Sequence, residues 1–259
     1  MRYFRFLDTL ALSEEVSHVF LYLGHICFLS VMFLYAWAIR KDRPYFTGIF
    51  RGSGRRNAVY ALFGALCGFC SMGICILAAC IHGDFEIAPP SVVRLPVLLF
   101  ALAAVFLQAT TEEIESRGFV FGRLKAEGIP LAAASAVSVF FFTFIHADNP
   151  GFAFIPLLSI FVIGIEYALS THYFGTIWFA CTAHMMWNFS QDFLFGLPDS
   201  GHPAVISIFQ TTVKGSGFFY DEVFGIESSV IAVLVNLSVC VIIFLIGRHM
   251  QKKKNKIPL

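Results

Sequence analysis

The stretch VVRLPVLLFALAAVFLQATTEEIESR, residues 92–117, joins an apolar run to a cluster of charged residues. Its apolar part, residues 92–110, is long enough to cross a hydrocarbon core of about 30 Å as a helix. The polar part carries Glu112, Glu113 and Arg117 in the pattern EExxxR. Because ionisable groups are expensive in or at the end of a membrane helix, this stretch predicts both a fold class and a candidate functional site.

Further apolar runs of similar length recur along the 259 residues, of which 58% are apolar and only 14% are charged. The mean hydropathy of +0.75 is far from that of a soluble domain. We therefore predict an all-α fold, a polytopic membrane bundle of about seven transmembrane helices; the alternative is eight helices, one of them re-entrant or interfacial. The expected helices cover residues 16–39, 58–81, 92–110, 129–145, 152–170, 173–195 and 228–247.

The basic residues are unevenly distributed between the two sides of this predicted bundle. All but four of the 18 Lys and Arg residues fall in the first and third connecting loops and in the C-terminal tail. The positive-inside rule then predicts a cytoplasmic C-terminus and an N-terminus outside. We expect one membrane-embedded domain over residues 1–259, with an extracytoplasmic or interfacial loop at 196–227 and a basic cytoplasmic tail at 248–259. The four exceptions are Arg2, Arg5, Arg94 and Lys214.

The net charge, the cysteine positions and one glycine pattern limit which partners, covalent links and helix contacts are expected. The net charge of +1 provides no basic surplus for nucleic acid, so no nucleic-acid partner is expected, whereas the lipid bilayer is. All seven cysteines lie in apolar runs, which favours buried free thiols over disulfides. Gly64 and Gly68 form a GxxxG pattern that is typical of close packing between membrane helices.

The EExxxR motif separates the two glutamates by helical geometry. Glu113 and Arg117 are four residues apart, so they share a helix face and are expected to form an ion pair. Glu112 points about 100° away from Glu113 and is therefore free to face another group. Burial would make its carboxylate a candidate general base.

Two further motifs place polar groups in apolar runs. His146 ends the fourth run, four residues after Phe142, and His184 lies four residues before Asn188 on one face of the sixth run. Each motif alone is best interpreted as a hydrogen-bonded structural residue. Together with Glu112 they provide groups that activate a water molecule and stabilise an oxyanion. Alternatively, Glu112, His146 and His184 ligate a divalent metal such as zinc, which would acidify that water; the sequence leaves both open.

The ordered motifs EExxxR, FxxxH and HxxxN resemble those of the CAAX prenyl protease and bacteriocin-processing (CPBP) family of intramembrane endopeptidases. The resemblance implies that Glu112 and His146 activate water and that His184 and Asn188 hold the oxyanion or complete the polar site. It implies supporting roles for Glu113 with Arg117, and the FxxxH motif adds Phe142. The implied substrate is a membrane-anchored or prenylated protein or peptide, and the implied enzyme is either a metalloprotease or a glutamate-type hydrolase.

Two other functions compete with this hypothesis. A transporter would use intramembrane acids and histidines as an ion or proton relay, but the chain lacks the internal repeats typical of transporters. A non-catalytic membrane protein of the bacteriocin-immunity type would not need intact Glu112, His146, His184 and Asn188.

A few polar residues in the apolar runs stand outside the three motifs. Glu166 and Asp192 are expected to face the bundle interior, where they would line the cavity or pair with Arg117 or a histidine. His18 and His25, seven residues apart, are expected to be packing or interfacial histidines.

Overall fold

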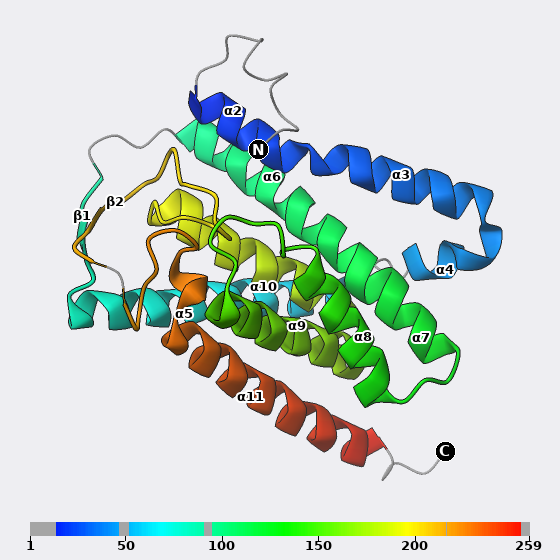
Figure 1. Cartoon of the computed structure of the whole chain (residues 1–259). Helices are drawn as coiled ribbons and strands as arrows, with labels where there is room; N and C mark the ends of the chain where they lie inside the picture. The colour runs from blue at the N-terminus through cyan, green and yellow to red at the C-terminus, as the bar shows by residue number, and fades with distance from the viewer. Residues whose placement is uncertain (1–13, 47–51, 91–94, 216, 255–259) are drawn as a thin grey trace.

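The chain folds into a bundle of helices with a small two-stranded sheet at one end (Figure 1). This computed structural model describes residues 14–46, 52–90, 95–215 and 217–254. The helices are α2 (Glu14–Leu23), α3 (His25–Ala38), α4 (Arg43–Phe46), α5 (Gly54–His82), α6 (Leu95–Glu113), α7 (Gly122–Ala126), α8 (Leu131–Phe144), α9 (Phe154–Phe174), α10 (Trp178–Phe189) and α11 (Val230–Lys254). Short helical turns are η1 (Arg40–Asp42), η3 (Ile114–Phe121), η4 (Ser190–Leu194) and η5 (Ile226–Ser228), and the strands are β1 (Phe85–Ala88) and β2 (Gln210–Val213).

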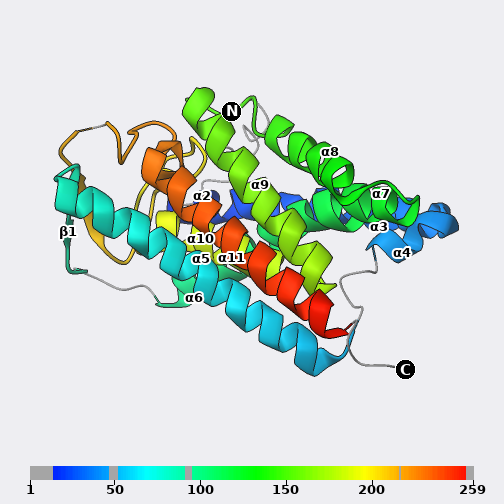
Figure 2. The same cartoon turned by 90° about the horizontal axis from the view of Figure 1, so that it is seen from below.

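Helix α10 lies at the centre of the bundle, packed against α5, α6 and α9. Helix α9 packs against α8 on one side and α11 on the other, and α2 and α3 lie along α6 (Figures 1 and 2). The main apolar core joins α5, α9, α10 and α11 and includes Met72, Tyr167 and Trp187. Large apolar side chains such as Leu62 and Phe63 of α5 face outwards, as expected of a lipid-facing surface.

Four helical segments are long and apolar enough to cross a membrane: Gly54–His82, Leu95–Ala126, Phe154–Phe174 and Val230–Lys253. The chain is therefore an integral membrane protein of mainly helical structure. Two shorter apolar helices, His25–Ala38 and Leu131–Phe144, lie at two more of the predicted positions. The predicted number of seven transmembrane helices stays a prediction.

Two predicted helix boundaries are wrong, each at a glycine. The expected helix at residues 16–39 is interrupted at Gly24, so that α2 and α3 are separate helices. The expected helix at 173–195 starts later, because Gly175 adopts a left-handed conformation, with φ of +66°, and ends α9 there. Helix α10 begins only at Trp178 and continues through the π-helical turn η4 to Leu194.

The GxxxG prediction is confirmed in the contact between α5 and α10. A Cβ atom on Gly64 would lie 2.2 Å from the carbonyl oxygen of Phe179, and one on Gly68 would lie 2.1 Å from that of Ala183. Only glycine allows the two backbones to approach this closely. The contact fixes the position of α10 along its axis, and its rotation about that axis, at Ala183, the residue before His184.

The expectation of an all-α fold is wrong at one place. Strands β1 and β2 pair antiparallel, with Phe85 opposite Val213 and Ala88 opposite Gln210. They tie the segment between α5 and α6 to the predicted loop at 196–227, so this loop carries regular structure (Figure 1). A periodicity of two over only four residues gives too little signal to predict such short strands.

Candidate active site

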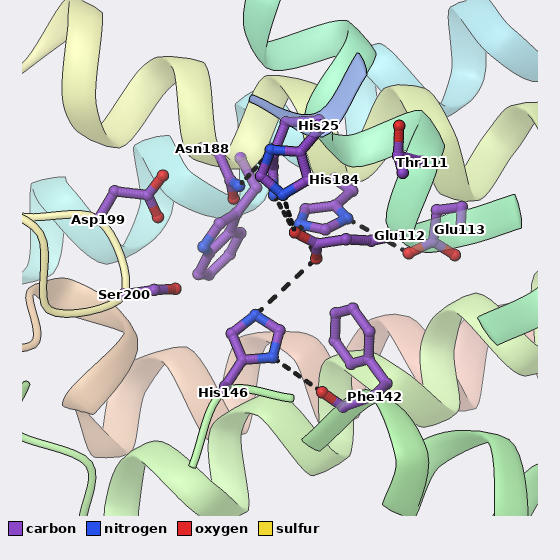
Figure 3. Close-up of polar contacts among 12 residues, drawn as sticks. His25, Thr111, Glu112, Glu113, Phe142, His146, His184, Asn188, Asp199 and Ser200 are labelled. Atoms are coloured by element: carbon purple, nitrogen blue, oxygen red, sulfur yellow. Dashed lines mark hydrogen bonds and ion pairs between the residues drawn. The ribbon is translucent and has the colours of Figure 1, made fainter. Parts of the chain in front are cut away.

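Glu112 lies at the C-terminal end of α6, where its carboxylate is buried and surrounded by imidazoles (Figure 3). Its Oε1 atom accepts a hydrogen bond from Nε2 of Gln108, one helical turn earlier. Its Oε2 atom has no hydrogen-bond partner although it is buried. The two oxygens of one carboxylate are therefore in different states, and Oε2 is the one left for chemistry.

His146 follows the end of α8 and directs its Nε2 atom to 3.9 Å from Oε2 of Glu112. Its Nδ1 atom lies 2.8 Å from the carbonyl oxygen of Phe142. Because a carbonyl only accepts, Nδ1 carries the hydrogen, so Nε2 is the nitrogen that is bare in the neutral form of the ring, and it faces the carboxylate. The Phe142 ring packs edge-on against His146, with ring centroids 5.0 Å apart.

His184 of α10 is held by a second polar chain. Its Nδ1 atom lies 3.3 Å from Oε1 of Glu113, which also accepts a hydrogen bond of 2.9 Å from Arg117. The carboxylate can only accept, so His184 also presents a bare Nε2, 3.9 Å from Oε2 of Glu112. The predicted ion pair between Glu113 and Arg117 is confirmed, and it acts on the site through His184.

Arg117 is fully buried, and its charge is well compensated. Besides Glu113, it donates to the carbonyl oxygen of Gly164, and it lies over the ring of Phe142 at 4.2 Å. These contacts join η3, α8 and α9 behind the catalytic residues. The π-helical form of η3 begins directly after Glu113, and such turns are frequent at functional sites.

Asn188 lies one turn after His184, and its Nδ2 atom donates to Oε1 of Gln108 at 3.3 Å. Asn188 also lines a small cavity. Three of the predicted site residues, His146, His184 and Asn188, line this cavity, whereas Glu112 is not among its lining residues. Its walls include Phe142, His146, His184, Asn188, Ser200 and Glu227.

His25 was predicted to be a packing or interfacial histidine, and the structure adds a contact with Glu112 that this prediction did not include. Its Nε2 atom lies 3.6 Å from Oε1 of Glu112, and its Nδ1 atom lies 3.1 Å from the carbonyl oxygen of Tyr22. A third imidazole therefore reaches the carboxylate from the start of α3. Sequence spacing gave no signal, because residues 25 and 112 meet only through packing of α3 on α6. The side chain of His18 lies outside the part of the chain that can be described.

The sequence analysis also missed Gln108, Ser200 and Glu227. Gln108 had a detectable signal, since it precedes Glu112 by four residues in an otherwise apolar run. Glu227 accepts hydrogen bonds from Nε1 of Trp187 at 2.9 Å and from the backbone and hydroxyl of Ser200. Ser200 and Glu227 come from the ends of the loop at 196–227, and no sequence motif marks either of them.

Glu166 and Asp192 are buried inside the bundle, as predicted. Asp192 accepts a hydrogen bond of 2.7 Å from the Tyr22 hydroxyl. Glu166 lies in α9 with its Oε2 atom buried and without a hydrogen bond. Neither is among the residues that line the cavity, and the alternative prediction, pairing with Arg117 or a histidine, stays a prediction.

The predicted metal ligands were tested against the spacing of their donor atoms. Zinc ligands bind at about 2.0 to 2.2 Å, so two donors on one ion lie about 3.3 Å apart. Both histidine Nε2 atoms are 3.9 Å from the Glu112 oxygen. Within the described ranges, no group of three His, Cys, Asp or Glu side chains is arranged to hold an ion. The donor types suit zinc, but their spacing does not.

Comparison with known proteins gives one match. A family model described as "Type II CAAX prenyl endopeptidase Rce1-like" matches residues 94–190. No curated protein and no solved structure matches the chain. The matched segment contains Glu112, His146, His184 and Asn188, whereas His25, Ser200 and Glu227 lie outside it.

Proposed function

We propose that the chain is a membrane endopeptidase of the CPBP family, which its match to an Rce1-like family model over residues 94–190 supports, and that it hydrolyses a peptide bond with water activated by Glu112. The observation that carries the proposal is the buried, unpartnered Oε2 atom of Glu112. Two bare imidazole nitrogens, from His146 and His184, face it at 3.9 Å. With both imidazoles neutral, the three atoms are all acceptors, and a water molecule between them can donate to two of them, Oε2 of Glu112 and Nε2 of His146.

The proposed reaction gives each group a separate role. A water held between Glu112 and His146 attacks the peptide carbonyl carbon while its proton passes to Oε2 of Glu112. The oxygen of the tetrahedral intermediate accepts a hydrogen bond from Nδ2 of Asn188 in the cavity. When the C–N bond breaks, Glu112 returns the proton to the leaving amine. His184 faces the same oxygen of Glu112 and completes the polar site.

Glu113, Arg117 and Phe142 act indirectly in this proposal. Glu113 accepts the Nδ1 hydrogen of His184 and so keeps its Nε2 bare. Arg117 holds Glu113, and its guanidinium lies over Phe142, whose ring also contacts both catalytic histidines. Losing any of these three would tilt an imidazole without removing a reacting atom.

The proposed substrate is a membrane-anchored or prenylated protein or peptide. The cavity is too small for a peptide chain, and two of its lining residues, Ser200 and Glu227, belong to the ends of the 196–227 loop. A peptide substrate therefore requires this loop or a neighbouring helix to move. The substrate's lipid anchor would remain in the bilayer that surrounds α5 and α11.

The proposed orientation places the C-terminus in the cytoplasm and the N-terminus outside. The end of the bundle that carries α4, α7 and the C-terminal end of α11 also carries basic side chains (Figures 1 and 2). These support a cytoplasmic location for that end and an extracytoplasmic one for the 196–227 loop. They are Arg40, Lys41, Arg43, Arg123, Lys125 and Arg248; residues 255–259 of the predicted tail lie outside the described residues.

The decisive experiment is the variant Glu112→Gln in detergent-purified protein. It keeps the shape of the side chain but removes the base, so cleavage of a quenched fluorescent, farnesylated CAAX-type peptide should fall on the order of 10²- to 10⁴-fold. Glu166→Gln is the matched control, because it neutralises another buried glutamate, one that forms no ion pair with His146 or His184 in the described part of the chain, and it should cleave normally. Wild-type cleavage by Glu112→Gln would refute the proposal.

The metalloprotease alternative has its own measurement. Metal content and cleavage are compared in the same wild-type sample before and after chelation, and in His146→Ala. Stoichiometric metal that is lost together with activity in both treatments would establish an ion at Glu112, His146 and His184. Cleavage that survives chelation in a metal-free sample but is lost in His146→Ala would establish the glutamate and histidine mechanism.

A further inference from the structure

Gln108 is a buried amide that contacts two predicted catalytic residues on different helices. From α6, its Nε2 atom donates to Oε1 of Glu112, and its Oε1 atom accepts from Nδ2 of Asn188 on α10 at 3.3 Å. The side chain is 7% exposed. It therefore links the group that takes a proton from water to the group that stabilises the oxyanion.

The orientation of this amide follows from its neighbours. With Glu112 ionised, its oxygen only accepts, so Gln108 must present Nε2 to it. Its Oε1 atom then faces Asn188, which must present Nδ2. Turning the Gln108 amide over would set oxygen against oxygen at Glu112 and nitrogen against nitrogen at Asn188, which costs both hydrogen bonds.

Two consequences for the reaction follow from this orientation. Since Oε1 of Glu112 already accepts a hydrogen bond, the incoming proton is directed to Oε2, which faces His146 and His184. The Nδ2 atom of Asn188 has two hydrogens and uses one on Gln108. The second hydrogen is left for an acceptor in the cavity that Asn188 lines.

We propose that Gln108 is the positioning residue of this site, which orients the base Glu112 and the oxyanion donor Asn188 through a single amide. This inference rests on the proposed peptidase function. It assigns to Gln108 no contact with substrate, so its removal changes the rate of the chemical step and leaves substrate binding in place.

The test compares kcat and KM for the farnesylated CAAX-type peptide in Gln108→Met and wild type. Methionine keeps the length and volume but makes neither hydrogen bond. Losing hydrogen bonds to a charged group should lower kcat on the order of 10- to 100-fold, with KM within about twofold. Thr111→Val is the matched control, because it removes a buried hydroxyl that only bonds its own helix at Leu107, and its kcat should stay within about twofold.

A double-mutant cycle distinguishes positioning of Asn188 by Gln108 from a general loss of activity. If Gln108 acts partly through Asn188, then Gln108→Met should cost clearly less in an Asn188→Ala background than in wild type. Effects that multiply fully would overturn the proposal, as would wild-type kcat in Gln108→Met. Should Gln108→Met fail to fold, Gln108→Asn replaces it in the cycle, because its amide is too short to reach both partners.

The cycle is also measured on the thermal unfolding midpoint, which does not depend on activity. A wild-type protein that does not cleave would refute the proposed function. In that case, coupling between Gln108→Met and Asn188→Ala in unfolding would still support the bridge, and its absence would refute the bridge separately.

Discussion

Two groups of buried carboxylates lie side by side in this protein and are neutralised in different ways. In the candidate active site, which we call the catalytic centre after the proposed function, Glu112 and Glu113 face cations or groups that can become cations: three histidines and Arg117. In the second group, which we call the loop cluster and define as Asp192, Asp199 and Glu227, hydrogen bonds come from the neutral donors Tyr22, Trp187 and Ser200.

The difference teaches which carboxylates can move a proton. A carboxylate that faces imidazoles has partners that take up and release protons near neutral pH. A carboxylate held by indole, hydroxyl and backbone N–H groups has only fixed donors. The loop cluster therefore fastens the 196–227 segment to α10 and α2, whereas the catalytic centre is left free to react at Oε2 of Glu112.

Tyr22 contacts two carboxyl groups of the loop cluster with one hydroxyl group. Its single hydroxyl hydrogen cannot serve both Asp192, at 2.7 Å, and Asp199, at 3.0 Å. Burial, and then the nearby charges of Glu227 and Asp192, raise the pKa of Asp199 well above its usual range.

The largest stability effect is expected where the catalytic centre loses its cation. Arg117→Met leaves Glu113 buried with an uncompensated charge, which should lower the free energy of unfolding by about 3 to 5 kcal/mol. Thermal and denaturant unfolding in detergent measure this. The double variant Arg117→Met with Glu113→Gln should recover much of the loss, and equal stability of the single and double variants would contradict the ion-pair explanation.

A smaller effect is expected in the loop cluster, where no cation is lost. Glu227→Gln keeps an acceptor for Trp187 but sets an amide N–H₂ against the donors of Ser200. The free energy of unfolding should fall by about 1 to 3 kcal/mol. Glu222→Gln, an exposed change in the same loop, is the control and should not alter the midpoint. An unchanged midpoint in Glu227→Gln would mean that Glu227 does not fasten the loop.

Asp199→Asn is expected to have the smallest effect on the free energy of unfolding at acidic pH, because the native Asp199 carboxyl is already protonated at that pH. A raised pKa in the folded state means that wild type loses stability as the pH rises from the usual Asp range through the raised pKa of Asp199. Asparagine cannot ionise, so the variant should gain in relative stability as the pH increases. Melting temperatures across a pH series measure this, with Asp148→Asn, an exposed change, as control. Parallel pH profiles for Asp199→Asn and wild type would contradict the assignment.

Part of the candidate site could be predicted because it depends on one helix at a time. The pairing of Glu113 with Arg117 follows from their spacing of four residues. The same spacing places His184 and Asn188 on one face of α10, and the GxxxG pattern marks the contact of α5 with α10. Local spacing also identifies Gln108 as a neighbour of Glu112, although its second contact, with Asn188, depends on packing.

The sequence by itself determined a helical membrane protein with an ordered set of polar motifs, because apolar length and helical spacing are properties of each segment alone. Only the tertiary structure decided that His25 reaches Glu112 and that Ser200 and Glu227 wall the cavity. It also decided that a two-stranded sheet ties the loop to the bundle. These contacts join residues far apart in the chain, and they depend on how close neighbouring backbones approach, which glycines such as Gly64 and Gly68 set in three dimensions.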